Sequence, residues 1–208
     1  MEDLMRLTRA EAKAANRAAL LDAARILVSQ DGASVSVEAI ASAAGLTTGA
    51  IYSIFGSKND LLVTLINENL ARIHGFLDRI EDPSLTLEQA IDAFLEAWFA
   101  AYQGDTAAQD MFALQVILAA AEDESLTTKL TAATSAENRA IARHLVDRVV
   151  TESGGSVRRT TPAEAADIAL AIQAILSGFS LRENFSPGQS TDLMRRACAS
   201  LAGLATTR

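Results

Sequence analysis

Four uncharged residues share one face of a short helix that the sequence predicts over residues 48–55. They are Thr48, Gly49, Tyr52 and Ser53. Threonine and serine hydroxyls can exchange hydrogen bonds with base edges, and a threonine methyl group can contact thymine. Glycine permits close approach of the backbone to a duplex, and Thr47 stands at a helix N-terminus suited to anions. The Tyr52 hydroxyl can reach a phosphate, with partial burial of Tyr52 against the first helix as the alternative. This face therefore has the chemistry of a DNA contact.

The stretch 37–56 supplies the two helices that must position this face. Its first apolar residues step by three and four, as on one side of a helix: Val37, Ile40, Ala41 and Ala44. Gly45 can adopt the left-handed conformation that ends such a helix, and Thr47 is predicted to cap the next one. The inward face of that second helix is Ile51, Ile54 and Phe55. Two short helices around a glycine turn predict a helix-turn-helix, whose second helix enters the major groove of DNA.

The charge distribution permits DNA binding but does not demand it. The formal net charge is −8, of which residues 1–60 contribute −1 and residues 61–208 contribute −7. Because salt screens charges beyond ~10 Å, the local charge determines the attraction to phosphates. Four basic residues precede the helix-turn-helix: Arg6, Arg9, Lys13 and Arg17. Arg17 is the best phosphate candidate among them, whereas the other three form either a minor-groove arm or a disordered tail.

Helical signals continue along the whole chain, and no segment alternates with the period of a strand. Only 3 of the 208 residues are proline, and 50% are hydrophobic. We expect helices from Ala10 to Gln30, from Ser57 to near Asp82 and from Ser125 to about Thr151. Capping boxes predict two further helix starts, at Thr86 and at Thr161. The prediction is an all-α protein of about nine helices.

The run from Leu20 to Leu70 resembles the TetR family of bacterial transcriptional regulators. The shared features are the LLDAA helix, Gly32, Ile40-Ala41, Ala44-Gly45-Leu46, Gly49, Ile51-Tyr52, Phe55 and Ser57-Lys58 before Leu61-Leu62. The resemblance implies a DNA-binding domain at residues 1–56 and a ligand-binding and dimerisation domain at 57–208, with 57–82 as the linking helix. It also implies that Lys58 contacts a phosphate, although an ordinary solvated charge is the alternative. Many relatives have a basic residue in place of Thr48 and a larger one in place of Ser53, which suggests modest contact per half-site.

The resemblance further implies a homodimer, paired through its last two helices, that binds a pseudo-palindromic operator and is released by a small ligand. The expected dimer contacts are Ile168, Ile172, Ile175, Phe179, Leu193, Ala197 and Leu201. Aromatic and soft side chains suggest a pocket for that ligand, with plain core as the equal alternative: Phe94, Trp98, Tyr102, Met111, Phe112 and Gln115. Because few buried charges are suggested, we expect a mostly apolar effector. Members of this family usually repress transcription, so we expect a repressor, and an activator remains the alternative.

Other functional classes have less support. The chain has no HExxH sequence, glycine-rich phosphate loop or cysteine–histidine pairing, so we expect neither an enzyme nor a cofactor. His74 and His144 are far apart, so a metal site is not expected. A single cysteine, no leader and no apolar run near ~18 residues predict a cytoplasmic protein without a membrane partner. A dimeric helical scaffold that binds other proteins suits the net charge of −8 and remains the competing class.

Overall fold

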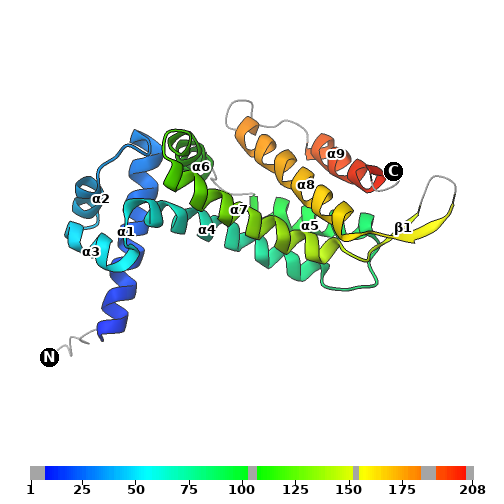
Figure 1. Cartoon of the computed structure of the whole chain (residues 1–208), viewed down its shortest axis with the longest axis horizontal. Coiled ribbons are helices and arrows are strands. Elements are labelled where there is room, and N and C mark those ends of the chain that lie inside the picture. The colour runs from blue at the N-terminus through cyan, green and yellow to red at the C-terminus, as the bar shows by residue number, and fades with distance from the viewer. Residues whose placement is uncertain (1–7, 103–106, 152–154, 184–190, 205–208) are drawn as a thin grey trace. The chain divides into compact units, whose positions relative to one another are not determined.

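The computed structural model describes residues 8–102, 107–151, 155–183 and 191–204, most of which are helical (Figure 1). The helices are α1 (Arg9–Asp31), α2 (Val37–Ala43), α3 (Thr48–Phe55), α4 (Lys58–Leu77), the 3-10 helix η1 (Asp78–Ile80), α5 (Leu87–Tyr102), α6 (Ala107–Ala120), α7 (Glu124–Leu145), α8 (Pro162–Glu183) and α9 (Thr191–Leu204). Two strands, β1 (Val149–Thr151) and β2 (Val157–Arg159), join α7 to α8. The predicted all-α class with about nine helices is confirmed.

Side-chain caps fix several of the helix starts that the sequence predicts. The Thr86 hydroxyl accepts from the Gln89 amide at 3.2 Å, and the Gln89 side chain accepts from the Thr86 amide at 2.9 Å. Thr161 and Glu164 form the same reciprocal pair before α8, where Pro162 takes the first helical position. The start of α7 differs from the prediction, because the Asp123 carboxylate, not Ser125, accepts from the Leu126 amide.

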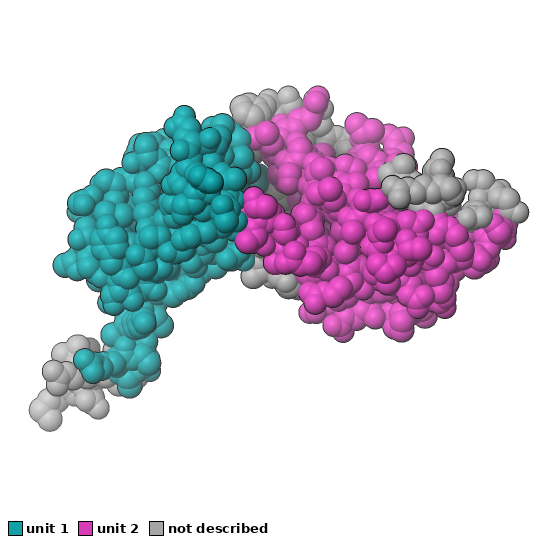
Figure 2. All heavy atoms as spheres, in the orientation of Figure 1, with its two compact units in different colours: residues 1–68, 108–130 teal, residues 69–107, 131–208 magenta. Residues whose placement is uncertain are grey.

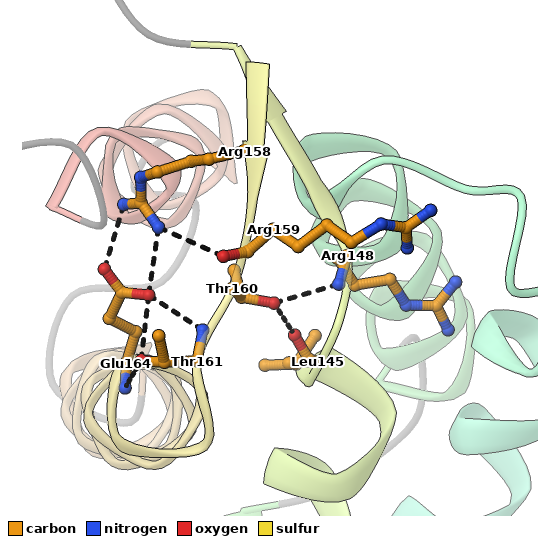
Figure 3. Close-up of polar contacts among 7 residues, drawn as sticks. All are labelled: Leu145, Arg148, Arg158, Arg159, Thr160, Thr161 and Glu164. Carbon is orange, nitrogen blue, oxygen red and sulfur yellow. Dashed lines mark hydrogen bonds and ion pairs between the residues drawn. The ribbon is translucent and has the colours of Figure 1, made fainter.

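The two strands are an element that the sequence analysis missed. They pair antiparallel, with Val150 opposite Arg158, so the predictions of no strand and of a helix continuing to Thr151 are wrong. The helix ends earlier because Asp147 has a φ of 63°, which no α-helix tolerates. The buried Thr160 then holds the hairpin base, accepting from the Arg148 amide and donating to the Leu145 carbonyl (Figure 3).

The chain folds into two compact units (Figure 2). Unit 1 contains residues 1–68 and 108–130, and unit 2 contains residues 69–107 and 131–208. The first unit thus combines the helix-turn-helix with α6 and the start of α7. The boundary expected after residue 56 stays a prediction.

Each unit has its own apolar core. In unit 1, α1, α2 and α3 pack around Leu20, Ala24 and Ile40, each of which is fully buried. In unit 2, side chains of α5, α7, α8 and α9 form one cluster that includes Phe94, Ile141, Ile172 and Cys198. Burial on this scale is the main source of stability for such a bundle.

Arg148 is a buried cation at the base of the hairpin in unit 2. Its guanidinium donates to the main-chain carbonyls of Ile80, Asp82 and His144. Burial lowers the pKa of Arg148, and the charge of Asp82 opposes that shift. Among the described charged residues only Arg148 and Glu137 are buried, in line with the expectation of few buried charges.

Helix α8 is more apolar than the sequence analysis expected. Residues 162–182 have a mean hydropathy of 1.3, long and apolar enough by composition to cross a membrane, so the statement that no run approaches this length is wrong. One side of α8 is buried in the core, through Ala165, Ile168 and Ala169. A core helix of a soluble protein has the same composition, so this property alone is weak evidence for a membrane span.

Candidate nucleic-acid interface

The turn between α2 and α3 has the hydrogen bonds that a glycine-terminated helix predicts. The Gly45 amide donates to the Ser42 carbonyl at 3.0 Å, and the Leu46 amide donates to the Ala41 carbonyl at 2.8 Å. Gly45 itself has a φ of 68°, so the two bonds form a Schellman motif around a left-handed residue. The chain bends by 100° between the two helices, which is the geometry of a helix-turn-helix.

A substitution at Gly45 tests this turn. No atom would lie within 4 Å of an added Cβ, so Gly45→Ala costs only the strain of a positive φ, about 1 kcal/mol of unfolding free energy. The matched control is Gly49→Ala, which lies within helical α3 and should leave stability unchanged or slightly higher. Thermal unfolding of both variants measures the difference, and equal effects would contradict the turn described here.

Ile51 anchors α3 to the rest of unit 1. Its side chain is fully buried, as are those of Ile40 and Ala41 on α2. Ile54 and Phe55, also predicted to face inward, are only half-buried. The anchored side leaves the opposite side of α3 open to solvent.

The exposed side of α3 carries the predicted DNA contacts. Gly49, Tyr52 and Ser53 are exposed, and the Tyr52 side chain is 54% accessible, which excludes close packing against α1. Thr48 is half-buried. The structure thus brings these four residues together on one accessible, uncharged surface.

Thr47 does not act as the predicted side-chain cap. It takes the N-cap position with extended backbone angles, but its hydroxyl makes no capping hydrogen bond. Its main-chain carbonyl instead accepts from the Ala50 amide at 2.9 Å, which starts the helix. The exposed Thr47 hydroxyl and the first-turn amides of α3 can therefore meet a phosphate.

Lys58 is less free than a solvated lysine. Its ammonium donates to the Ala33 carbonyl at 2.6 Å, and burial lowers its pKa. One of its three protons is thereby committed to the α1–α2 connection, and the others remain for an anion. The side chain fastens α4 to the helix-turn-helix, and its role at DNA stays a prediction.

Arg17 also has intramolecular partners. Its guanidinium lies 2.9 Å from Glu68 Oε1 and 5.8 Å from the centre of the Phe55 ring. These contacts place it beside α3 with its side chain 44% exposed. Arg9 and Lys13 are exposed on α1, and Arg6 lies outside the described residues.

A polar bridge in unit 1 was not foreseen from the sequence. It consists of four residues, Asn59, Asp60, Asp123 and Lys129. The Asn59 amide donates to Asp123 at 2.9 Å, and Lys129 forms an ion pair with Asp60. The hydrogen bond from Lys129 is the largest cause that lowers the pKa of Asp60. These contacts join the first turn of α4 to the start of α7. The sequence did not predict them because the paired residues lie more than 60 positions apart.

The predicted pocket residues fall into both units. Phe94 and Trp98 belong to the core of unit 2, where the Trp98 ring lies edge-on to Phe179 at 6.4 Å. Met111, Phe112 and Gln115 belong to unit 1, and the Gln115 side chain lies against Gly32. The side chain of Tyr102 lies outside the described residues. The role of the whole group in binding a ligand stays a prediction.

The predicted dimer contacts also differ in exposure. Ile168, Ile172 and Leu201 are buried in the core of unit 2, whereas Leu193 is 63% exposed. Ile175, Phe179 and Ala197 are half-buried. The exposed stripe of α8 instead contains Ala166, Leu170 and Ala174, spaced by four residues. The periodicity identified the apolar helices but not which side of each faces the core.

Comparisons with known proteins agree with this geometry. Residues 20–65 match the family model of the bacterial regulatory proteins, tetR family. No curated protein matches the chain.

Solved structures share the fold over nearly the whole length. A proposed transcriptional regulator from Pseudomonas aeruginosa PAO1 is 21% identical, with 97% of this chain and 94% of that chain covered and a TM-score of 0.70. A proposed TetR-family regulator from Rhodococcus sp. is 18% identical, with 93% and 100% covered and a TM-score of 0.66. The multidrug binding protein EbrR, complexed with imidazole, is 23% identical, with 89% and 88% covered and a TM-score of 0.60. At these identities the likeness shows the fold.

Proposed function

We propose that this protein, whose residues 20–65 match the model of the bacterial regulatory proteins of the tetR family, is a one-component regulator that represses transcription. It binds a pseudo-palindromic operator as a homodimer and is released by a small, mostly apolar ligand. The observation that carries the proposal is α3, an anchored helix whose exposed side is polar, beyond a 100° bend from α2. That arrangement suits insertion into the major groove.

The uncharged face of α3 indicates where the affinity would come from. Thr48 and Ser53 offer hydroxyls for base edges, whereas Thr47, Tyr52 and Gly49 suit the sugar–phosphate backbone. Arg17 and Lys58 would add charge, although each is partly committed to a partner within the protein. Affinity would therefore depend strongly on two copies binding together.

A homodimer fits the surface of α8. Leu170 is 58% exposed in a helix of high hydropathy, and small alanines lie one turn to either side of it. Small residues allow close helix packing, and an exposed apolar stripe of this kind usually has a partner. Two such faces, with α9 beside them, would set the spacing of the recognition helices at roughly 34–36 Å or more.

The effector would bind in the C-terminal domain, at residues 57–208. The aromatic side chains of unit 2 give apolar walls, and EbrR is described as a multidrug binding protein. Ligand binding would shift α4 and change the separation of the recognition helices. A coupling free energy of about 1–3 kcal/mol between ligand binding and operator binding would give graded release from the DNA. A near-complete switch between the bound and released states needs about 5.5 kcal/mol.

Three variants test the assignment of contacts. Tyr52→Phe and Lys58→Ala should weaken binding to every duplex, because phosphate contacts carry no sequence information. Lys58→Ala should also reduce the slope of the logarithm of the binding constant against the logarithm of salt concentration by about one. Ser53→Ala should change base preference by about 1–3 kcal/mol at one position. Binding to DNA fragments selected by the protein measures both effects, with the exposed Ser125→Ala as the matched control. Equal losses on all DNA from every variant would contradict the division of roles.

The competing functions make different predictions. A protein-binding scaffold would show no DNA affinity that falls with salt, and an activator would raise transcription from a reporter carrying the selected operator. The family's soluble regulators are usually cytoplasmic, and we propose the same location here.

A further inference from the structure

Unit 2 contains a buried acidic side chain. Glu137 lies on α7 and is only 4% exposed. It is placed on the inward stripe of that helix, one turn before Ile141, which belongs to the core cluster. An apolar residue at this position would pack without any polar cost, so a buried carboxylate here calls for an explanation.

The hydrogen bonding of Glu137 is incomplete. The side chain of Gln173, on α8, is its hydrogen-bond partner, but Oε1 is buried with no partner among the described residues. The Oδ1 atom of the neighbouring Asn138 is likewise buried without a partner. Buried acceptors are nearly always satisfied, so each of these two atoms calls for a donor that the described residues do not supply.

No cation of the described chain balances the charge. Burial and the Gln173 hydrogen bond are the two causes that shift the pKa of Glu137, and no arginine or lysine contributes. Burial is the larger cause and raises the pKa to about 7. The carboxylate is therefore held near its ionisation point, where an added cation would fix the charged form.

Glu137 lies beside the apolar core of unit 2. Ile141, one turn after Glu137, and Ile172, which precedes Gln173, both belong to this core. A group that reaches Glu137 must therefore carry hydrocarbon with it.

We propose that Glu137 is the anchor for the effector and that the effector is a lipophilic amine, whose ammonium group donates hydrogen bonds to Glu137 Oε1 and Asn138 Oδ1. The proposal rests on the proposed function, in which unit 2 binds the releasing ligand. An ammonium group supplies both the missing donors and the missing positive charge. A hydroxyl group supplies only a donor, and a carboxylate supplies neither and is repelled.

A series of ligands with one tail and three head groups tests this proposal. Decylammonium, decanol and decanoate are titrated into the full-length protein without DNA, with the fluorescence of Trp98, the single tryptophan, as the signal. Decylammonium should bind at least about tenfold more tightly than decanol, and decanoate should bind most weakly. Glu137→Gln should remove the preference for decylammonium while decanol binding stays within about twofold, which also reports that the variant is folded. The exposed Glu88→Gln is the matched control and should keep the wild-type preference.

Two results would overturn the proposal: equal binding of the three ligands to the wild type, or an unchanged ammonium preference in Glu137→Gln. The proposed function fails separately. A protein that binds its operator but has no amine preference contradicts only the anchor. A protein with a Glu137-dependent amine preference and no affinity for DNA contradicts the regulator and leaves the amine site standing.

Discussion

Arg148→Met should lower the free energy of unfolding by about 3–5 kcal/mol. The substitution removes the guanidinium but keeps most of the side-chain volume. It leaves the buried carbonyl of Ile80 and the partly buried carbonyls of Asp82 and His144 without their donor. Each unsatisfied group costs about 1–3 kcal/mol, less where water can enter. Denaturant unfolding followed by circular dichroism, at fixed protein concentration, measures the loss.

The matched control for this prediction is Arg143→Met, an exposed arginine of the same helix. That substitution should change the unfolding free energy by less than about 0.5 kcal/mol. A loss in Arg148→Met no greater than that of the control would show that the turn before α5 does not depend on Arg148.

Glu137→Gln should stabilise the protein above pH 7 and leave it unchanged near pH 4. The pKa of Glu137 is raised from 4.5 to about 7 in the folded state, so between these values the folded protein binds more protons than the unfolded chain. Wild-type stability therefore falls as the pH rises through this window, by a total of about 3 kcal/mol. The neutral glutamine lacks this penalty.

Unfolding at pH 4, 6 and 8 measures this effect in the wild type and the variant. The difference between them should be absent at the lowest pH and largest at the highest. Glu88→Gln again serves as the control and should not change the pH profile. A variant less stable than the wild type at pH 8 would mean that the charge of Glu137 supports the fold. In that case Glu137→Gln would lower both stability and amine binding, whereas we predict that it raises stability and lowers amine binding.

The features that the sequence predicted well depend on neighbours along the chain. The glycine turn at residue 45, the buried Ile51 and the reciprocal cap of Thr86 and Gln89 each need residues only a few positions apart. Local geometry and hydrophobic spacing determine such features, so the sequence expresses them directly.

The features that it missed depend on distant segments. The three-residue strands are too short to show alternation, although Val149, Val150 and Thr151 are all β-branched. The Lys129–Asp60 ion pair and the bond from Lys58 to Ala33 each join segments tens of residues apart. Glu137 looks like a surface residue in the sequence, because its burial and its hydrogen bond to Gln173 of α8 arise only in the fold.

The central claim is that α3 of a dimer reads DNA, and a salt titration tests it most directly. Fluorescence anisotropy compares the full-length protein on DNA from its own upstream region with a scrambled duplex of equal length, at rising salt concentrations. We predict tight binding to the upstream DNA that weakens linearly with the logarithm of salt, and a preference of at least about a thousandfold over the scrambled duplex. Binding that is absent, insensitive to salt or equal on both duplexes would contradict this account.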